Sequence, residues 1–199
     1  MTHRRSADRS SRCLGRPRKR GIALPCCSVR DLTYRGSPRR TLGRANSAEG
    51  AEMKAFVMRG PGGLNRPEIV ERPDPGQPGP GEVRVALHAT SLNYHDLLVA
   101  TGQFPAADGR VLMSDGAGVV EAVGSGATEF KPGDHVVSCF FPQWQDGLPQ
   151  TAVGSFAGVP GDGIDGFAVL HAVQAVHAFT HAPKGWSHAE AATITTAGL

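Results

Sequence analysis

One glycine pattern in this sequence could bind a nucleotide, but its neighbours argue against that chemistry. Residues 161–166 match G-x-G-x-x-G, which holds a dinucleotide when it follows a buried strand and opens a helix. Here Pro160 comes directly before the pattern, and Asp162 and Asp165 lie within it. Both carboxylates would repel phosphate. The sequence therefore predicts an ordinary loop at this position.

The residue types that ligate metals are present, but their spacing does not favour a metal site. His177 and His181 are four residues apart, which would place both on one face of a helix, yet Pro183 follows closely. The cysteines form no C-x-x-C pair, so neither a zinc ribbon nor a thioredoxin-type site is expected. Cys13, Cys26 and Cys27 precede residue 53, and Cys139 follows it. A single cysteine beyond that point favours a reducing, cytoplasmic location.

Positive charge is concentrated in residues 1–52, which hold thirteen basic and four acidic residues, against eight and fourteen in the remainder. This segment is rich in Arg, Ser, Gly and Pro and poor in apolar runs, so it is predicted to be disordered. Three interpretations stay open: natural translation begins at Met53, the segment is a transit peptide, or it is an arm that binds nucleic acid. No interleaved aromatic residues support the third, so nucleic acid is not the expected partner. No apolar run is long enough for a transmembrane helix, so no membrane association is expected either.

Beyond residue 52, short strands are separated by turns rich in Gly and Pro. This pattern predicts a mainly β fold with a few short helices, arranged as a closed or nearly closed barrel. Residues 187–190 form a capping box that begins a last helix. The expected strands are residues 53–58, 82–89, 118–123, 135–138 and an apolar segment at 167–179, with a short helix at 94–100.

Several segments resemble one known family in the expected order. Residues 116–136 are similar to the N-terminal domain of medium-chain dehydrogenase/reductases, the relatives of alcohol dehydrogenase and quinone oxidoreductase, and so are residues 80–85, 91–96 and 197–199. The resemblance implies a GroES-like β-barrel over residues 53–185. It further implies that residues 186–199 start the helix leading to a Rossmann domain, which binds NAD(P)H in the family and is absent from this chain.

The same resemblance predicts that the protein uses no zinc. Zinc-dependent members place a Cys, a His and a second Cys around the metal, where this chain has Asn93, Ser114 and Thr196. Neutral amides and hydroxyls are poor zinc ligands beside thiolates and imidazoles. The segment 140–147 is also similar to zinc-lacking members. These departures indicate the quinone-oxidoreductase-like branch.

Without metal, hydrogen-bond donors must stabilise the charge that develops on a substrate oxygen. The resemblance assigns these roles by position: catalysis by Asn93, Tyr94 and His95, substrate contact by Ser114, Phe141 and Trp144, and cofactor contact by Thr196. His95 would shuttle protons near neutral pH. Structural roles remain open as well, with Asn93 as a helix cap, Tyr94 in packing and His95 on a helix surface.

The resulting functional hypothesis is the substrate-side domain of a zinc-independent NAD(P)-dependent oxidoreductase. It would transfer hydride to or from a carbonyl, quinone or alcohol, and full-length members of the family allow a homodimer. The chain by itself is expected to be inactive. Two alternatives stand beside it: a stand-alone, non-catalytic binding domain, and nucleic-acid association through the basic segment.

Overall fold

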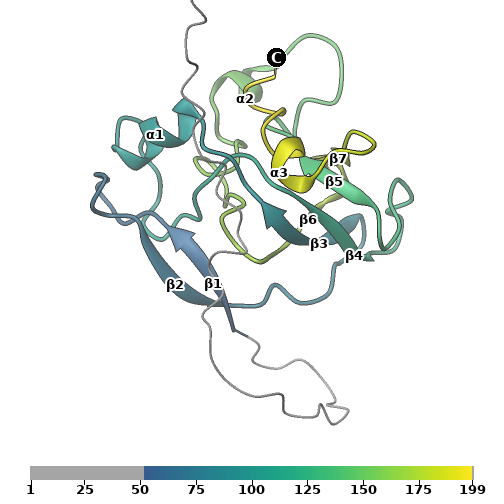
Figure 1. Cartoon of the computed structure of the whole chain (residues 1–199). Coiled ribbons are helices and arrows are strands. Elements are labelled where there is room, and N and C mark those ends of the chain that lie inside the picture. Colours follow the sequence, from purple (N-terminus) through teal and green to yellow (C-terminus); the bar gives the residue numbers. More distant parts are fainter. Residues whose placement is uncertain (1–51, 199) are drawn as a thin grey trace, which may run out of the picture.

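The computed structural model describes residues 52–198 as a curled antiparallel β structure with three short helices (Figure 1). One sheet has five strands in the order β6-β3-β4-β5-β7, and β1 pairs with β2 beside it. The strands are β1 (Glu52–Val57), β2 (Glu68–Pro73), β3 (Glu82–Ala89), β4 (Ala117–Val123), β5 (His135–Ser138), β6 (His171–Ala175) and β7 (Phe179–His181), and the helices are α1 (Tyr94–Ala100), α2 (Thr151–Gly154) and α3 (His188–Ala191).

The expectations for the basic N-terminal segment and its three cysteines lie outside the described residues, except that Glu52 is the first residue of β1. The division into residues 53–185 and 186–199 stays a prediction, although α3 begins within the second range. All strand pairs among residues 52–198 are antiparallel, so this part of the chain contains no βαβ unit. It also has no helix long and apolar enough to cross a bilayer.

Strand β3 is an interior strand of the sheet, and its residues alternate between apolar and polar types. Val83, Val85 and Leu87 point into the core and are buried, while the residues between them are partly exposed. Each buried aliphatic side chain of this size contributes about 1.5–3 kcal/mol. The strand pairs with β4 on one side and β6 on the other, which places its inward face at the centre of the main core cluster.

The single strand predicted for residues 167–179 is wrong. Instead, β6 and β7 are separated by a 3-10 turn, Val176–Ala178. The two strands lie at opposite edges of the five-stranded sheet, so one extended segment cannot serve both. Since only three residues join them, the sheet must curl until its edges come close together. This curl produces the nearly closed barrel that the sequence predicts.

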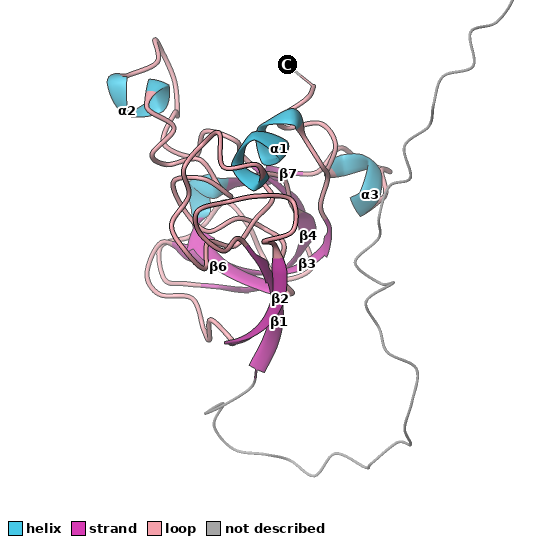
Figure 2. Ribbon diagram, turned by 90° about the vertical axis from the view of Figure 1, so that its left-hand side faces the viewer, coloured by secondary structure: helices cyan, strands magenta, loops and turns pink. Residues whose placement is uncertain are grey.

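The helices lie toward the end of the molecule where the described chain finishes, with β1 and β2 at the other end (Figures 1 and 2). Helix α3 contacts β3 and β4 through Ala191 and Ala192, which are fully buried against Ala89 and Ala117. Val99 of α1 is buried in a separate apolar cluster. The loops next to β3, β4 and α3 therefore meet at one end of the barrel.

A charge cluster fixes the outer face of β3. The Arg84 guanidinium donates to both carboxylate oxygens of Asp74 at 2.5 and 2.8 Å, and to Glu121 at 2.8 Å. His171 lies beside the same carboxylates, with its Nδ1 3.3 Å from Asp74. Hydrogen bonding from Arg84 lowers the pKa of Asp74 to about 2. The cluster ties the 73–81 loop to three strands.

This lowered pKa predicts an acid-dependent loss of stability. The folded state favours ionised Asp74, so the contribution is present above about pH 4 and disappears as the pH falls toward about 2. We expect Asp74→Asn to lower the free energy of unfolding by about 2 kcal/mol at pH 7 and by much less at pH 2. Urea unfolding across this pH range measures the difference. The exposed Asp146→Asn is the matched control, and an equal effect of both variants at pH 7 would contradict the prediction.

Candidate functional site

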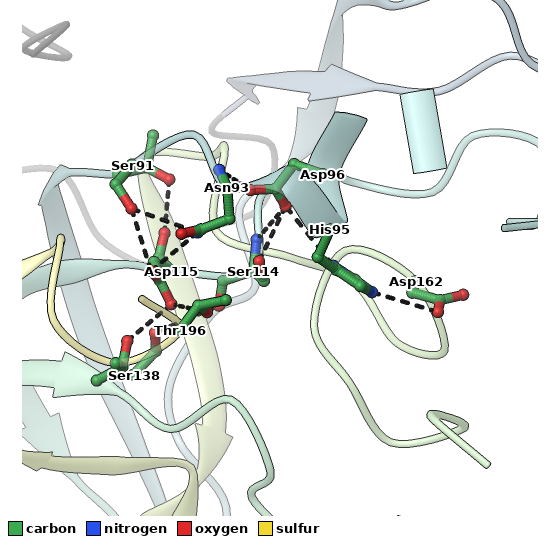
Figure 3. Close-up of polar contacts among 11 residues, drawn as sticks. Ser91, Asn93, His95, Asp96, Ser114, Asp115, Ser138, Asp162 and Thr196 are labelled. Carbon is green, nitrogen blue, oxygen red and sulfur yellow. Dashed lines mark hydrogen bonds and ion pairs between the residues drawn. The ribbon is translucent and has the colours of Figure 1, made fainter. Parts of the chain in front are cut away.

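A fully buried carboxylate, Asp115, joins three loops at the helical end of the barrel (Figure 3). Its Oδ2 atom accepts hydrogen bonds from Ser91 Oγ at 3.1 Å and Asn93 Nδ2 at 3.0 Å. Its Oδ1 atom accepts from Thr195 Oγ1 at 2.7 Å and Thr196 Oγ1 at 2.6 Å. All four side-chain donors are neutral, so the carboxylate is stabilised by converging dipoles.

Local structure places each of these donors. Ser91 and Asn93 lie in the loop between β3 and α1, Asp115 comes two residues before β4, and Thr195 and Thr196 follow α3. Because β3 and β4 are neighbours and α3 contacts both, the three loops end at the same place. The Asp115 carboxylate thereby holds the C-terminal segment of the described chain against the barrel.

A second buried carboxylate, Asp96, lies on the other side of the same loops. It accepts from the backbone N–H of Asn93 at 2.8 Å, as half of a capping box for α1. It also accepts from the N–H and Oγ of Ser114, both at 2.9 Å. Burial raises the pKa of Asp96, and these hydrogen bonds oppose the shift. The carboxylate connects α1 to the loop before β4.

His95 is buried between two carboxylates and three aromatic rings. Its Nδ1 lies 4.0 Å from Asp96 Oδ1, and its Nε2 lies 3.5 Å from Asp162 Oδ2. Within residues 52–198, neither ring nitrogen makes a hydrogen bond. The surrounding rings lie 5.2–6.1 Å from the imidazole: Phe104, Phe140 and Phe156. Figure 3 shows the imidazole turned away from Asp115 and toward Asp162. An imidazolium here would have a carboxylate on each side.

The structure brings together some of the predicted site residues and separates others. Asn93 and Thr196 share Asp115, and Ser114 reaches Asp96, so the three positions that match zinc ligands lie in one polar network. The Tyr94 side chain is 74 % exposed and lies outside this network. Phe141 and Trp144 line a cavity of about 300 Å³ elsewhere in the domain. The catalytic and binding roles of all these residues remain predictions.

Sequence reasoning missed the two residues that organise the site. Asp115 follows Ser114 in the segment where zinc-dependent members have their histidine. An aspartate in a loop does not by itself predict that four hydrogen-bond donors surround it. Asp162 was considered only as a residue that would repel phosphate. Its approach to His95 comes from the folding of the 155–166 loop, for which no local pattern exists.

The glycine pattern at residues 161–166 is a loop with no strand directly before it and no helix after it, as expected. Asp165 accepts from Arg72 at 2.8 Å and Arg110 at 3.3 Å, so its carboxylate serves the scaffold. A Cβ atom on Gly163 would lie 2.1 Å from the carbonyl oxygen of Ala157, which explains this glycine by close packing. Among the described residues, no group of three or more His, Cys, Asp or Glu side chains is arranged to hold a metal ion.

Comparison with known families and proteins agrees with this architecture. Residues 79–184 match the alcohol dehydrogenase GroES-like domain. A zinc-type alcohol dehydrogenase-like protein of Schizosaccharomyces pombe is 40 % identical over 136 residues, which are 67 % of this chain and 38 % of that protein.

Solved structures of oxidoreductases share the fold. A thermostable alcohol dehydrogenase from Pyrobaculum aerophilum superposes with a TM-score of 0.61 at 28 % identity, covering 73 % of this chain and 44 % of that one. A quinone oxidoreductase from Pseudomonas syringae gives 0.54 at 28 % identity, covering 72 % and 37 %. The chain spans less than half the length of each of these relatives. Because residues 79–184 match the family model, this chain belongs to the family of alcohol dehydrogenase GroES-like domains, within the medium-chain dehydrogenase/reductases.

Proposed function

We propose that this domain forms the substrate side of a zinc-independent, NAD(P)-dependent oxidoreductase that acts on a carbonyl, quinone or alcohol. One observation carries the zinc independence. The side chains at the three positions that match zinc ligands donate their hydrogens to two buried carboxylates, with Asn93 and Thr196 on Asp115 and Ser114 on Asp96.

This arrangement does not fit zinc. The metal prefers thiolate, imidazole and carboxylate ligands, whereas these positions offer an amide and two hydroxyls. The hydrogen-bond donors already satisfy both carboxylates, so the network is complete without a cation. The fission yeast relative is named a zinc-type alcohol dehydrogenase-like protein. In this chain, however, none of the three matching positions carries a side chain that zinc prefers as a ligand.

The described residues also do not form the cofactor's main binding surface. In the glycine loop, Asp162 lies beside His95, and Asp165 accepts hydrogen bonds from Arg72 and Arg110. The Thr196 hydroxyl donates to Asp115. When bound, NAD(P)H supplies the hydride. We propose that another domain of the whole protein holds it. The 199-residue chain alone should then oxidise NADH or NADPH no faster than a control without protein, for any aldehyde or quinone tested.

His95 is the residue of this site best suited to hold a proton, since both ring nitrogens lack hydrogen bonds and both face carboxylates. Asp162 has a side chain that is 13 % exposed, so it links the buried imidazole to solvent. A proton taken from solvent by His95 can pass to the substrate oxygen as hydride arrives at the carbon. Asp96 and Asp162 lie beside the two ring nitrogens and orient the ring.

We expect His95→Asn to reduce kcat about a hundredfold in the whole enzyme, because a positioned acid of this kind contributes about 10²–10⁴-fold. Asp162→Asn should keep more activity, since it removes only the carboxylate that lies beside Nε2 of the ring. His181→Asn, an exposed histidine, is the matched control. Unchanged kcat and pH profile in His95→Asn would reject the proton-transfer role.

Metal analysis of the purified whole enzyme tests zinc independence separately. We expect full activity with zinc far below one ion per chain, and no loss after dialysis against a chelator. Zinc at one ion per chain, together with activity lost on chelation and restored by zinc, would overturn this part of the proposal. The kinetic test of His95 is independent of that outcome.

A further inference from the structure

The cavity of about 300 Å³ is lined by residues of three separate segments, and four of the nine lining residues are phenylalanine or tryptophan. Phe130 precedes β5, Phe141 and Trp144 follow it, and Phe179 begins β7. Phe130 and Phe179 are buried, whereas Trp144 is 42 % exposed at the mouth. The volume lies at the lower end of the range for pockets that bind small molecules, about 300–1,000 Å³.

Two of the lining aromatic rings contact each other. The Phe141 and Trp144 rings meet edge to face with centroids 6.3 Å apart, and the indole N–H donates to the carbonyl oxygen of Gly147 at 3.1 Å. That hydrogen bond satisfies the polar atom of Trp144 and holds the ring in place. Its apolar surface is therefore free for a ligand ring, which prefers stacked or edge-on contact with such residues.

The lining offers an anion no lysine or arginine. Glu129 and His177 are the ionisable residues that line the cavity besides Cys139, and no lysine or arginine does. Burial raises the pKa of the Cys139 thiol, so this side chain is neutral at pH 7. An anionic ligand would find no lysine or arginine to pair with and would meet the Glu129 carboxylate, whereas an uncharged ligand needs no counter-charge.

The cavity is separate from the polar network around Asp115. Ser138 lies on the network side, where its Oγ accepts from the N–H of Gly116 at 2.9 Å. Cys139 is the next residue, and its N–H donates to Ala178, which continues the pairing of β5 with β7 by one residue. Cys139 lines the cavity together with Phe179, the pairing partner of Ser138. None of the residues that hydrogen-bond to Asp115 lines it.

We propose that this cavity is a binding site for an uncharged planar aromatic molecule of one or two rings, held between Phe141, Trp144 and the Cys139 wall. The site does not depend on hydride transfer or on the role of His95. It gives Phe141 and Trp144 a ligand of defined chemistry, in a cavity whose lining shares no residue with the Asp115 network.

The test uses the 199-residue chain, with 2-naphthol as the uncharged probe, naphthoate as the anion and naphthylmethylammonium as the cation. We expect 2-naphthol to bind with a Kd on the order of 0.1 mM and to slow alkylation of Cys139, mapped by peptide mass because three other cysteines are present. Naphthoate should give no protection. Absence of protection by 2-naphthol at its solubility limit overturns the proposal, and so does equal protection by naphthoate or tighter binding of the cation.

A pair of substitutions at one position checks that the ligand occupies this cavity. Cys139→Phe fills the space and should weaken 2-naphthol binding about tenfold or more, whereas Cys139→Ser leaves the space open and should preserve it. Equal affinities in the two folded variants would place the ligand elsewhere and reject the site. If Cys139→Phe does not fold, the alkylation test on the unaltered chain still decides.

Discussion

Asp115→Ala is expected to lower the free energy of unfolding by about 3 kcal/mol, because it leaves four side-chain donors without their acceptor. The donors are partly exposed and can recover some hydrogen bonds from water, which keeps the cost below that of four fully buried groups. The residues after α3 should detach first, since Thr195 and Thr196 hold them through Asp115. Urea unfolding gives the free energy, and amide exchange of residues 193–198 reports the local release.

Two milder substitutions serve as controls for Asp115→Ala. Thr195→Val removes one donor and should cost about 1 kcal/mol. Asp115→Asn keeps one acceptor oxygen and should fall between the two. If Asp115→Ala unfolds at the same urea concentration as the unaltered chain, then the carboxylate does not hold the network together. If amide exchange after α3 is unchanged, then the attachment of this segment does not depend on Asp115.

Gly118→Ala is expected to lower the free energy of unfolding by about 3 kcal/mol or more, because the new Cβ would overlap the neighbouring strand. It would lie 2.0 Å from the Ala86 carbonyl oxygen and 3.0 Å from the Cα of Leu87. Both contacts are with backbone, so no side-chain rotation can relieve them. The strands β3 and β4 would have to separate at the centre of the sheet, where the main core lies.

Gly154→Ala is the matched control for this prediction. Gly154 ends α2, and a Cβ there meets nothing within 4 Å. Its effect should therefore stay within about 0.5 kcal/mol, with any change in the stabilising direction, as alanine restricts the unfolded chain. Thermal and urea unfolding of both variants compare the two positions. Similar stabilities for Gly118→Ala and Gly154→Ala would show that the sheet adapts to the added methyl group.

The elements most accurately predicted are those whose signals are local. The bounds of β3 at residues 82–89 follow from alternating apolar residues, and the bounds of α1 at 94–100 agree with prediction as well. The predicted capping box of Ser187 and Glu190 is confirmed, with Ser187 Oγ accepting from the N–H of Glu190 at 3.3 Å. In each case a few neighbouring residues carry the whole signal.

Elements without a local signal were missed or misjudged. Strand β2 (Glu68–Pro73) is mostly exposed and is specified by its pairing with β1, so its own residues show little alternation. The predicted strand at 167–179 divides because its two halves pair with β3 and β5 at opposite edges of one sheet. Apolar composition indicates burial there, but it cannot say which partner each half will find.

For the site, the residue types alone show which side chains stand at the positions that bind zinc elsewhere in the family, and they predict metal-free chemistry. What those residues contact depends on the tertiary fold. Thr195 and Asp115 are 80 residues apart, and they meet because α3 lies across β3 and β4. His95 meets Asp162 through the folding of a distant loop. Local sequence patterns carry strand and helix periodicity, whereas contacts between distant residues depend on how the whole sheet curls.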